Sequence, residues 1–117
     1  MAYTLVVEDG SGEATATSYV SMADADNFLR SDINATAWAL ATSETKAKCL
    51  AMASRLIDQQ FNYQGESLRA DQALSWPRSL AYDRMGKEIV GVPTVIKRIT
   101  CKLANAMLQD SHRHVMN

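Results

Sequence analysis

The sequence is poor in several residue types, and each scarcity narrows what the protein can be. Only two cysteines occur in 117 residues, Cys49 and Cys101, which are too few for a disulfide framework and match no metal-binding spacing. Apolar runs are only a few residues long, so no membrane-spanning helix is expected. The first residues lack the basic and apolar regions of a secretory signal. We therefore expect a protein made in the cytoplasm, with reduced thiols and no membrane partner.

Net charge is also nearly absent. Twelve Lys and Arg residues oppose thirteen Asp and Glu residues, which leaves a net charge of -1. This balance is not typical of a strongly basic nucleic-acid-binding domain. The charges are segregated, however, because residues 1–45 carry seven acids and one base, whereas residues 46–117 carry six acids and eleven bases. Such polarity suits contacts with unlike partners, although separate solvated faces explain it as well.

No catalytic constellation is recognisable in the sequence. There is no nucleophile elbow and no phosphate-binding loop. Gly10-Ser11-Gly12 could cradle a phosphate, but the pattern is more typical of a tight turn. His112 and His114 could ligate a metal, but no third ligand is near, and a solvated pair is the simpler interpretation. We expect no enzymatic activity, no metal and no cofactor.

Hydrophobic periodicity predicts a mainly α protein, a small helical bundle in a single domain over residues 1–117. Ser21 and Ser43 are the expected N-caps, and Pro93 suits the first turn of the last helix. The expected elements, in chain order, are a short N-terminal strand over 3–7, helices over 22–30, 35–40 and 43–60, a long irregular loop over 62–91, a last helix over 93–111 and a short polar tail over 111–117.

The same periodicity predicts which side chains form the core. On the two longest expected helices, apolar residues fall on one face and charged residues on the other. The predicted core residues are Phe28, Leu29, Leu50, Ala53, Ile57, Phe61, Ile96, Ile99 and Leu103.

The loop over 62–91 is too apolar for a free linker, and loops of this length are commonly functional. It is rich in Arg, Trp and Tyr, the residue types that dominate interface hot spots. The alternatives are that the loop only seals its own core, and that Trp38 and Trp76 are buried rather than stacked on bases. The residues that we expect at an interface are Arg69, Trp76, Pro77, Arg78, Tyr82 and Arg84.

Three regions of the sequence carry a family resemblance. They are VEDGSG at 7–12 with SYVS at 18–21, QALSWPR at 72–78 with YDRMG at 82–86, and VIKRITCKLA at 95–104. With these stretches the chain resembles the small head–tail connector proteins of tailed bacteriophages, also called adaptor or head-completion proteins. The resemblance covers nearly the whole chain.

This resemblance implies a structural protein of the virion neck. Copies of the chain would form a ring, expected to be a dodecamer, beneath the portal vertex. The ring would extend the channel through which genomic DNA passes without sequence-specific binding. Its partners would be the portal protein and a tail or stopper (tail-completion) protein. By the same analogy the tail over 111–117, with His112, Arg113 and His114, would contact the portal.

Many relatives in this family are called DnaT-like single-stranded-DNA-binding proteins. The alternative function is therefore that name taken literally, a single-stranded-DNA-binding protein of replication. The near-neutral net charge counts against it, because phosphate binding needs concentrated cations.

Overall fold

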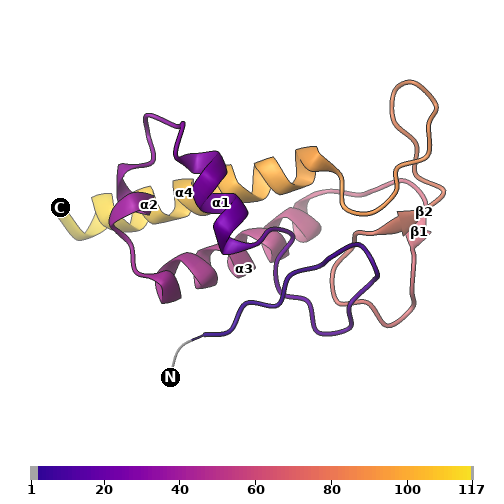
Figure 1. Cartoon of the computed structure of the whole chain (residues 1–117), viewed down its shortest axis with the longest axis horizontal. Helices are drawn as coiled ribbons and strands as arrows, with labels where there is room; N and C mark the ends of the chain where they lie inside the picture. Colours follow the sequence, from indigo (N-terminus) through magenta and orange to yellow (C-terminus); the bar gives the residue numbers. More distant parts are fainter. Residues whose placement is uncertain (1–2, 117) are drawn as a thin grey trace.

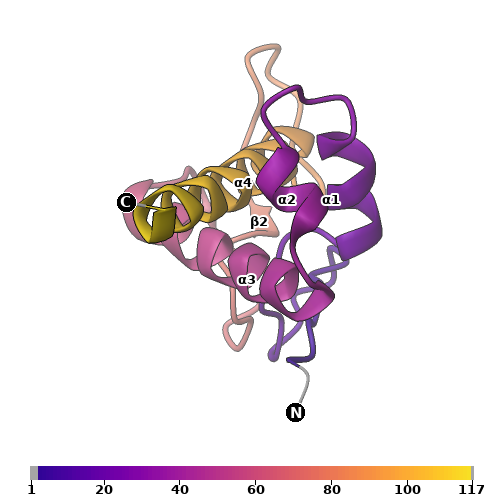
Figure 2. The ribbon, with the colours of Figure 1, turned by 90° about the vertical axis from the view of Figure 1, so that its left-hand side faces the viewer.

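Two long helices form the body of the protein. The computed structural model describes residues 3–116, and side chains over 3–109. Helices α3 (Ser43–Gln60) and α4 (Thr94–Met116) run antiparallel and lie side by side (Figures 1 and 2). The short helices α1 (Met22–Leu29) and α2 (Thr36–Leu40) cover one side of this pair. The expected mainly α fold is confirmed.

Local hydrogen bonds explain where the helices begin. The Ser21 hydroxyl accepts a bond from the Asp24 N–H at 3.1 Å, so Ser21 caps α1 as predicted. The prediction of Ser43 as a cap was wrong by one residue. The Thr42 hydroxyl accepts from the Thr45 N–H at 3.2 Å, and Ser43 is already the first helical residue.

The expected N-terminal strand over 3–7 is not formed. This segment is extended, but it makes only an isolated parallel bridge between Val7 and Ser18. The chain bends at Gly10 and Ser11, and the pairing with Ser18 does not extend beyond this bridge. The strands of the described chain lie instead inside the long loop, where β1 (Glu66–Ser67) pairs antiparallel with β2 (Arg78–Ser79).

The core consists of two adjoining clusters of buried side chains. One joins α1 and α2 to α3 and α4 through residues such as Leu29, Trp38 and Leu50. The other fixes the long loop to the ends of α3 and α4, and contains Tyr19 and Trp76. The loop therefore folds onto its own chain, which agrees with the expectation that it packs against something. The residues predicted for the core and found buried are Leu29, Leu50, Ala53, Ile57 and Ile96, with Phe28 and Leu103 partly buried.

Two predicted core residues are exposed. Ile99 is 36% exposed, because the face of α4 that packs against the rest of the protein carries the smaller residues Thr100, Cys101 and Ala104. Thr100 fits there because its hydroxyl donates to the Ile96 carbonyl at 2.8 Å. Phe61 is 50% exposed, because it lies at the C-cap of α3, where the backbone leaves the helix and the helical period no longer applies.

Helix α4 is longer than expected. It continues to Met116, so the segment predicted to be a short polar tail is helical up to that residue. Within the described chain, no helix is long and apolar enough to cross a membrane.

Candidate functional site

Trp76 and Pro77 lie inside the protein. Trp76 is 5% exposed and packs edge-on against Tyr63, with ring centroids 5.4 Å apart. Its backbone N–H donates to the Tyr19 hydroxyl at 3.2 Å. Pro77 is also buried. In this state neither side chain can reach a partner, and an interface that uses this pair stays a prediction.

Arg78 organises the loop around it. Its Nε donates to the Gln64 carbonyl at 2.8 Å, and its Nη2 donates to the Gly65 carbonyl at 2.8 Å. The Nη1 atom donates to the Ser75 carbonyl at 3.1 Å. The guanidinium also lies 5.8 Å from the centre of the Tyr63 ring, within cation–π range. Through these three carbonyls the side chain ties the segment at Gln64 and Gly65 to the segment at Ser75.

Tyr82 and Arg84 belong to a hairpin over residues 81–90, which is closed by an antiparallel bridge between Tyr82 and Glu88 and projects from the body near β1 and β2 (Figure 1). The turn is held by Asp83, whose Oδ1 accepts from the backbone N–H groups of Met85 at 2.9 Å and Lys87 at 3.0 Å. Met85 at the tip is 90% exposed. A rigid turn thus presents an apolar side chain to solvent.

The remaining sequence-predicted positions are dispersed. Arg69 is exposed and pairs with Asp71 at 3.3 Å. His112, Arg113 and His114 fall on the last turns of α4, and their side chains lie outside the described ones. The structure therefore places Tyr82 and Arg84 on the hairpin and Arg69 beside the glycine-rich turn at Gly12.

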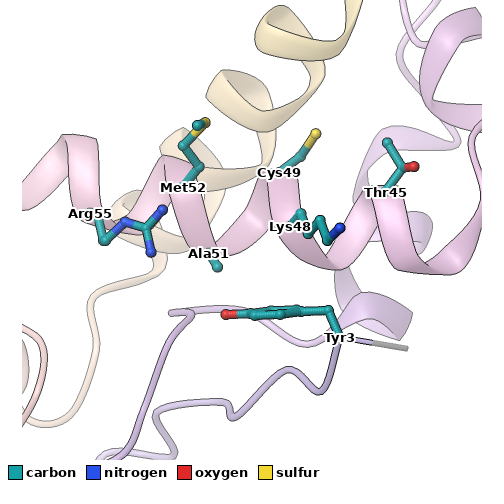
Figure 3. A pocket seen from close by; sticks show the side chains of 7 residues that line it. All are labelled: Tyr3, Thr45, Lys48, Cys49, Ala51, Met52 and Arg55. Carbon is teal, nitrogen blue, oxygen red and sulfur yellow. The ribbon is translucent and has the colours of Figure 1, made fainter. Parts of the chain in front are cut away.

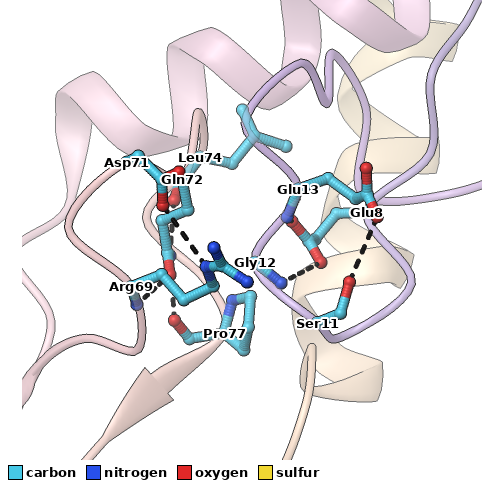
Figure 4. A network of polar contacts seen from close by, with 9 residues as sticks. All are labelled: Glu8, Ser11, Gly12, Glu13, Arg69, Asp71, Gln72, Leu74 and Pro77. Atoms are coloured by element: carbon cyan, nitrogen blue, oxygen red, sulfur yellow. Dashed lines mark hydrogen bonds and ion pairs between the residues drawn. The ribbon is translucent and has the colours of Figure 1, made fainter.

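The glycine-rich turn over 8–13 already holds an anion. The Glu8 side chain is buried, and its carboxylate accepts from the backbone N–H groups of Gly10, Gly12 and Glu13 at 2.8, 3.0 and 2.8 Å. The turn also touches the long loop, because a Cβ on Gly12 would come within 2.9 Å of the Arg69 side chain (Figure 4). The donors that could have cradled a phosphate are thus occupied by the protein's own carboxylate.

Trp38 is buried and takes part in a polar cluster with α1 and α3. Its indole N–H donates to Asp26 Oδ1 at 2.8 Å, and Lys46 Nζ lies 3.0 Å from the same oxygen. Partial burial by itself raises the pKa of Asp26, but the hydrogen bonds from Lys46 and Trp38 and the Lys46 charge outweigh it and hold this pKa below its usual value. With its N–H engaged and its ring buried, Trp38 is not a base-stacking platform.

Positive charge gathers on the outer sides of the two long helices. Lys48 and Arg55 on α3, and Arg98 and Lys102 on α4, are exposed and lie opposite the buried faces of their helices. Among the side chains over 3–109, none of these four forms an ion pair. We call these four residues the basic stripes.

The two acids of α3, Glu44 and Asp58, accept hydrogen bonds from other parts of the protein. Glu44 Oε1 accepts from the Tyr3 backbone N–H at 3.2 Å. Asp58 accepts from the Tyr19 hydroxyl at 2.5 Å and from the Ser75 N–H at 3.0 Å. Among the described side chains, neither acid forms an ion pair with Lys48 or Arg55.

An aromatic ring lies beside this stripe. The Tyr3 ring lies under α3 and faces Ala51, with Lys48 and Arg55 along the helix on either side (Figure 3). Together these residues line a hollow of about 320 Å³. The sequence showed that Lys48 and Arg55 lie on the polar side of their helix. It gave no signal for Tyr3, which is placed by a hydrogen bond to Glu44, 41 residues away.

Within the described residues, no three His, Cys, Asp or Glu side chains gather where they could hold a metal ion. What the site does offer is exposed cations beside an aromatic ring, which is the chemistry of a stacking and phosphate-binding surface.

The comparison with protein families gives a match over residues 3–115, to the family described as "Putative DnaT-like ssDNA binding protein". No curated protein and no solved structure matches the chain. The family description carries the DNA-binding name that the sequence resemblance led us to expect, and it does not mention a head–tail connector, which stays a prediction. Because the match spans nearly its whole length, the chain belongs to this DnaT-like family.

Proposed function

We propose that this protein binds single-stranded DNA without sequence preference, through the basic stripes of α3 and α4, and that it catalyses no reaction. The family description supports this proposal. The observation that carries it is the set of four exposed cations without ion-pair partners among the described side chains, Lys48, Arg55, Arg98 and Lys102. A backbone of phosphates is the partner that such stripes attract.

The net charge of -1 does not oppose this function once the charges are located. Between Thr94 and Gln109, α4 has three bases and no acid. The acids of α3 are held by hydrogen bonds to other parts of the protein. A local positive surface can therefore exist on a nearly neutral molecule.

Fluorescence anisotropy with labelled oligo(dT), measured over a range of salt concentrations, tests the proposal. Four phosphate contacts predict a slope of log K against log[salt] of about -3. Replacing all four cations of the stripes with Gln should abolish most of the binding and flatten this slope. Arg84→Gln with Lys87→Gln, on the projecting hairpin, is the control and should bind as the wild type does. The proposal is wrong if the wild type does not bind at low salt.

A second candidate function is the head–tail adaptor, and the hairpin favours it. Met85 is 90% exposed and Val90 87% exposed, and Tyr82 and Arg84 lie on the same hairpin. Exposed apolar side chains grouped with Tyr and Arg are typical of protein-binding surfaces. In this function the hairpin would dock on the portal or on a neighbouring copy in the ring.

Sedimentation with portal-bearing phage heads tests the second function. Met85→Ser combined with Val90→Ser should prevent attachment of the chain to the heads. Ile33→Ser removes an equally exposed apolar side chain, 93% exposed, from the loop between α1 and α2, and should leave attachment intact. Attachment that survives the hairpin changes would rule out the hairpin as the docking element.

A further inference from the structure

The hollow beside Tyr3 differs from the others in its chemistry. It is lined by one aromatic ring, two cations and a mostly apolar floor that includes Ala51 and Met52 (Figure 3). Its volume of about 320 Å³ lies within the range of small-ligand sites. Met52 is 49% exposed, so part of the floor is open to solvent.

The ring is held in place by the folded body. The Tyr3 backbone N–H is bound by Glu44, which fixes the chain at the ring itself. Two residues further on, Leu5 packs against the core, and the Val6 N–H donates to the Thr17 hydroxyl at 3.0 Å. A ligand that stacks on Tyr3 would therefore meet a surface that is already ordered, which reduces the entropy lost on binding.

The two cations are spaced along α3 on either side of the ring. Lys48 and Arg55 are seven residues apart, which corresponds to about 10 Å along a helix. Both side chains are long and exposed, and neither forms an ion pair with the side chains over 3–109. They can thus reach phosphates on both sides of a group that lies against Tyr3.

We infer that this hollow is a nucleotide subsite, in which one base of a single strand stacks on Tyr3 while Lys48 and Arg55 hold the flanking phosphates. This inference rests on the proposed single-stranded-DNA binding and assigns its central contact. The subsite accepts any base, since stacking on a ring does not require base-edge hydrogen bonds.

Three other hollows differ from this one. The one beside Trp38 also has a ring and two cations, Arg30 and Lys46, but Trp38 is buried, and Lys46 is paired with the Asp26 carboxylate, which would repel a phosphate. The one between α2 and α4 is lined by groups such as Leu40 and Leu108 and has no cation. The one at the base of the hairpin includes Glu88 and has no aromatic ring. The hollow beside Tyr3 thus differs from these three in combining an aromatic ring with two cations in a lining that has no carboxylate.

Substitution of the ring tests the inference, with oligo(dT) affinity at fixed salt as the readout. Tyr3→Ala should weaken binding by roughly 5- to 150-fold, the range of one lost stacking contact. Tyr3→Phe keeps the ring and should bind within about twofold of the wild type. Tyr82→Ala removes an exposed tyrosine from the hairpin, outside the lining of this hollow, and is the control. Circular dichroism confirms that each variant is folded.

Charge substitution and photo-crosslinking give independent readouts. Lys48→Gln and Arg55→Gln should each make the slope of log K against log[salt] shallower by the amount expected for one phosphate contact. Lys87→Gln should not change this slope. Ultraviolet crosslinking of the strand should label a peptide that contains Tyr3.

The outcomes separate the two proposals. Wild-type binding that Tyr3→Ala leaves unchanged overturns the subsite, while the DNA-binding function stands. Equal losses in Tyr3→Ala and Tyr82→Ala also overturn it, because the effect would then not be local. A wild type that does not bind the strand overturns both the function and the subsite.

Discussion

The Tyr19 hydroxyl donates a hydrogen bond of 2.5 Å to Asp58 Oδ1, and the Tyr19 hydroxyl oxygen itself accepts a bond from the Trp76 backbone N–H at 3.2 Å. The second Asp58 oxygen accepts from the Ser75 N–H at 3.0 Å. This buried relay joins the N-terminal segment, α3 and the long loop at one point. Burial raises the pKa of Tyr19, and the hydrogen bond to Asp58 and the negative charge of Asp58 raise it further. The hydroxyl therefore stays protonated and remains a donor.

Tyr19→Phe should lower the free energy of unfolding by about 2 kcal/mol, because it removes a bond to a charged group and leaves the Trp76 N–H without its acceptor. Urea denaturation measures the change. Tyr63→Phe is the control, since its hydroxyl makes only a long bond of 3.5 Å to the Ile57 carbonyl, and it should cost under about 1 kcal/mol. Equal losses of unfolding free energy in the two variants would show that the hydrogen bonds of the Tyr19 hydroxyl do not stabilise the protein more than the long bond of Tyr63 does.

Glu8→Ala should destabilise the protein by about 3 kcal/mol, because three backbone N–H groups lose a charged acceptor in a buried turn. Hydrogen exchange at Gly12 and Glu13 should rise in the same variant. Glu13→Ala is the matched control. The Glu13 carboxylate accepts only from the exposed Ser11 hydroxyl, at 3.2 Å, so Glu13→Ala should lower the stability of the protein only slightly. Unchanged exchange at Gly12 in Glu8→Ala would contradict the role given to this carboxylate.

Leu50→Ala and Ile99→Ala should differ in the stability that they cost, although the sequence placed both residues in the predicted core. Leu50 is fully buried on α3, and its truncation should cost about 2–5 kcal/mol. Ile99 is 36% exposed, and its truncation should cost under about 1 kcal/mol. Thermal and urea unfolding of both variants provide the comparison. A loss at Ile99 as large as that at Leu50 would mean that another surface covers it in solution.

The sequence predicted the helices well because periodicity and capping are local signals. It placed Leu29, Leu50 and Ile57 in the core correctly. It misjudged α4, because the most apolar stripe contains Ile99 while the packed face uses Thr100 and Cys101, whose small size permits close approach. Burial of the Thr100 hydroxyl cannot be inferred from an apolar pattern.

The candidate site was less predictable for the same reason. The exposed cations of α3 follow from helical spacing, but the ring beside them depends on a contact between Tyr3 and Glu44 across 41 residues. Arg78 has the residue type of an interface anchor, yet three backbone carbonyls of its own loop accept its hydrogen bonds. Composition indicates which side chains can bind a partner, whereas long-range contacts decide which remain available.

Asp26→Asn should destabilise the protein in a pH-dependent way. The pKa of Asp26 is lowered in the folded state, so its contribution to stability is present above its unfolded pKa of about 3.9 and is lost as the pH falls through the lower folded value. The difference between wild type and variant should therefore be largest at neutral pH and shrink below about pH 3.9. Urea unfolding across this range measures it. Asp71→Asn, in an exposed pair, should show little difference at any pH.

Arg78→Ala and Arg69→Ala test whether an arginine of the long loop is structural or exposed for binding. Arg78 donates to the carbonyls of Gln64, Gly65 and Ser75, and its truncation should cost about 2 kcal/mol and raise hydrogen exchange along the loop. Arg69 makes an exposed pair with Asp71, so its loss should cost at most about 0.5 kcal/mol. Arg78→Lys should recover little of the lost stability, because an ammonium cannot reach three separately placed carbonyls as a planar guanidinium does. Full stability in Arg78→Ala, measured by urea unfolding, would show that these three bonds do not hold the loop and would leave Arg78 free to contact a partner.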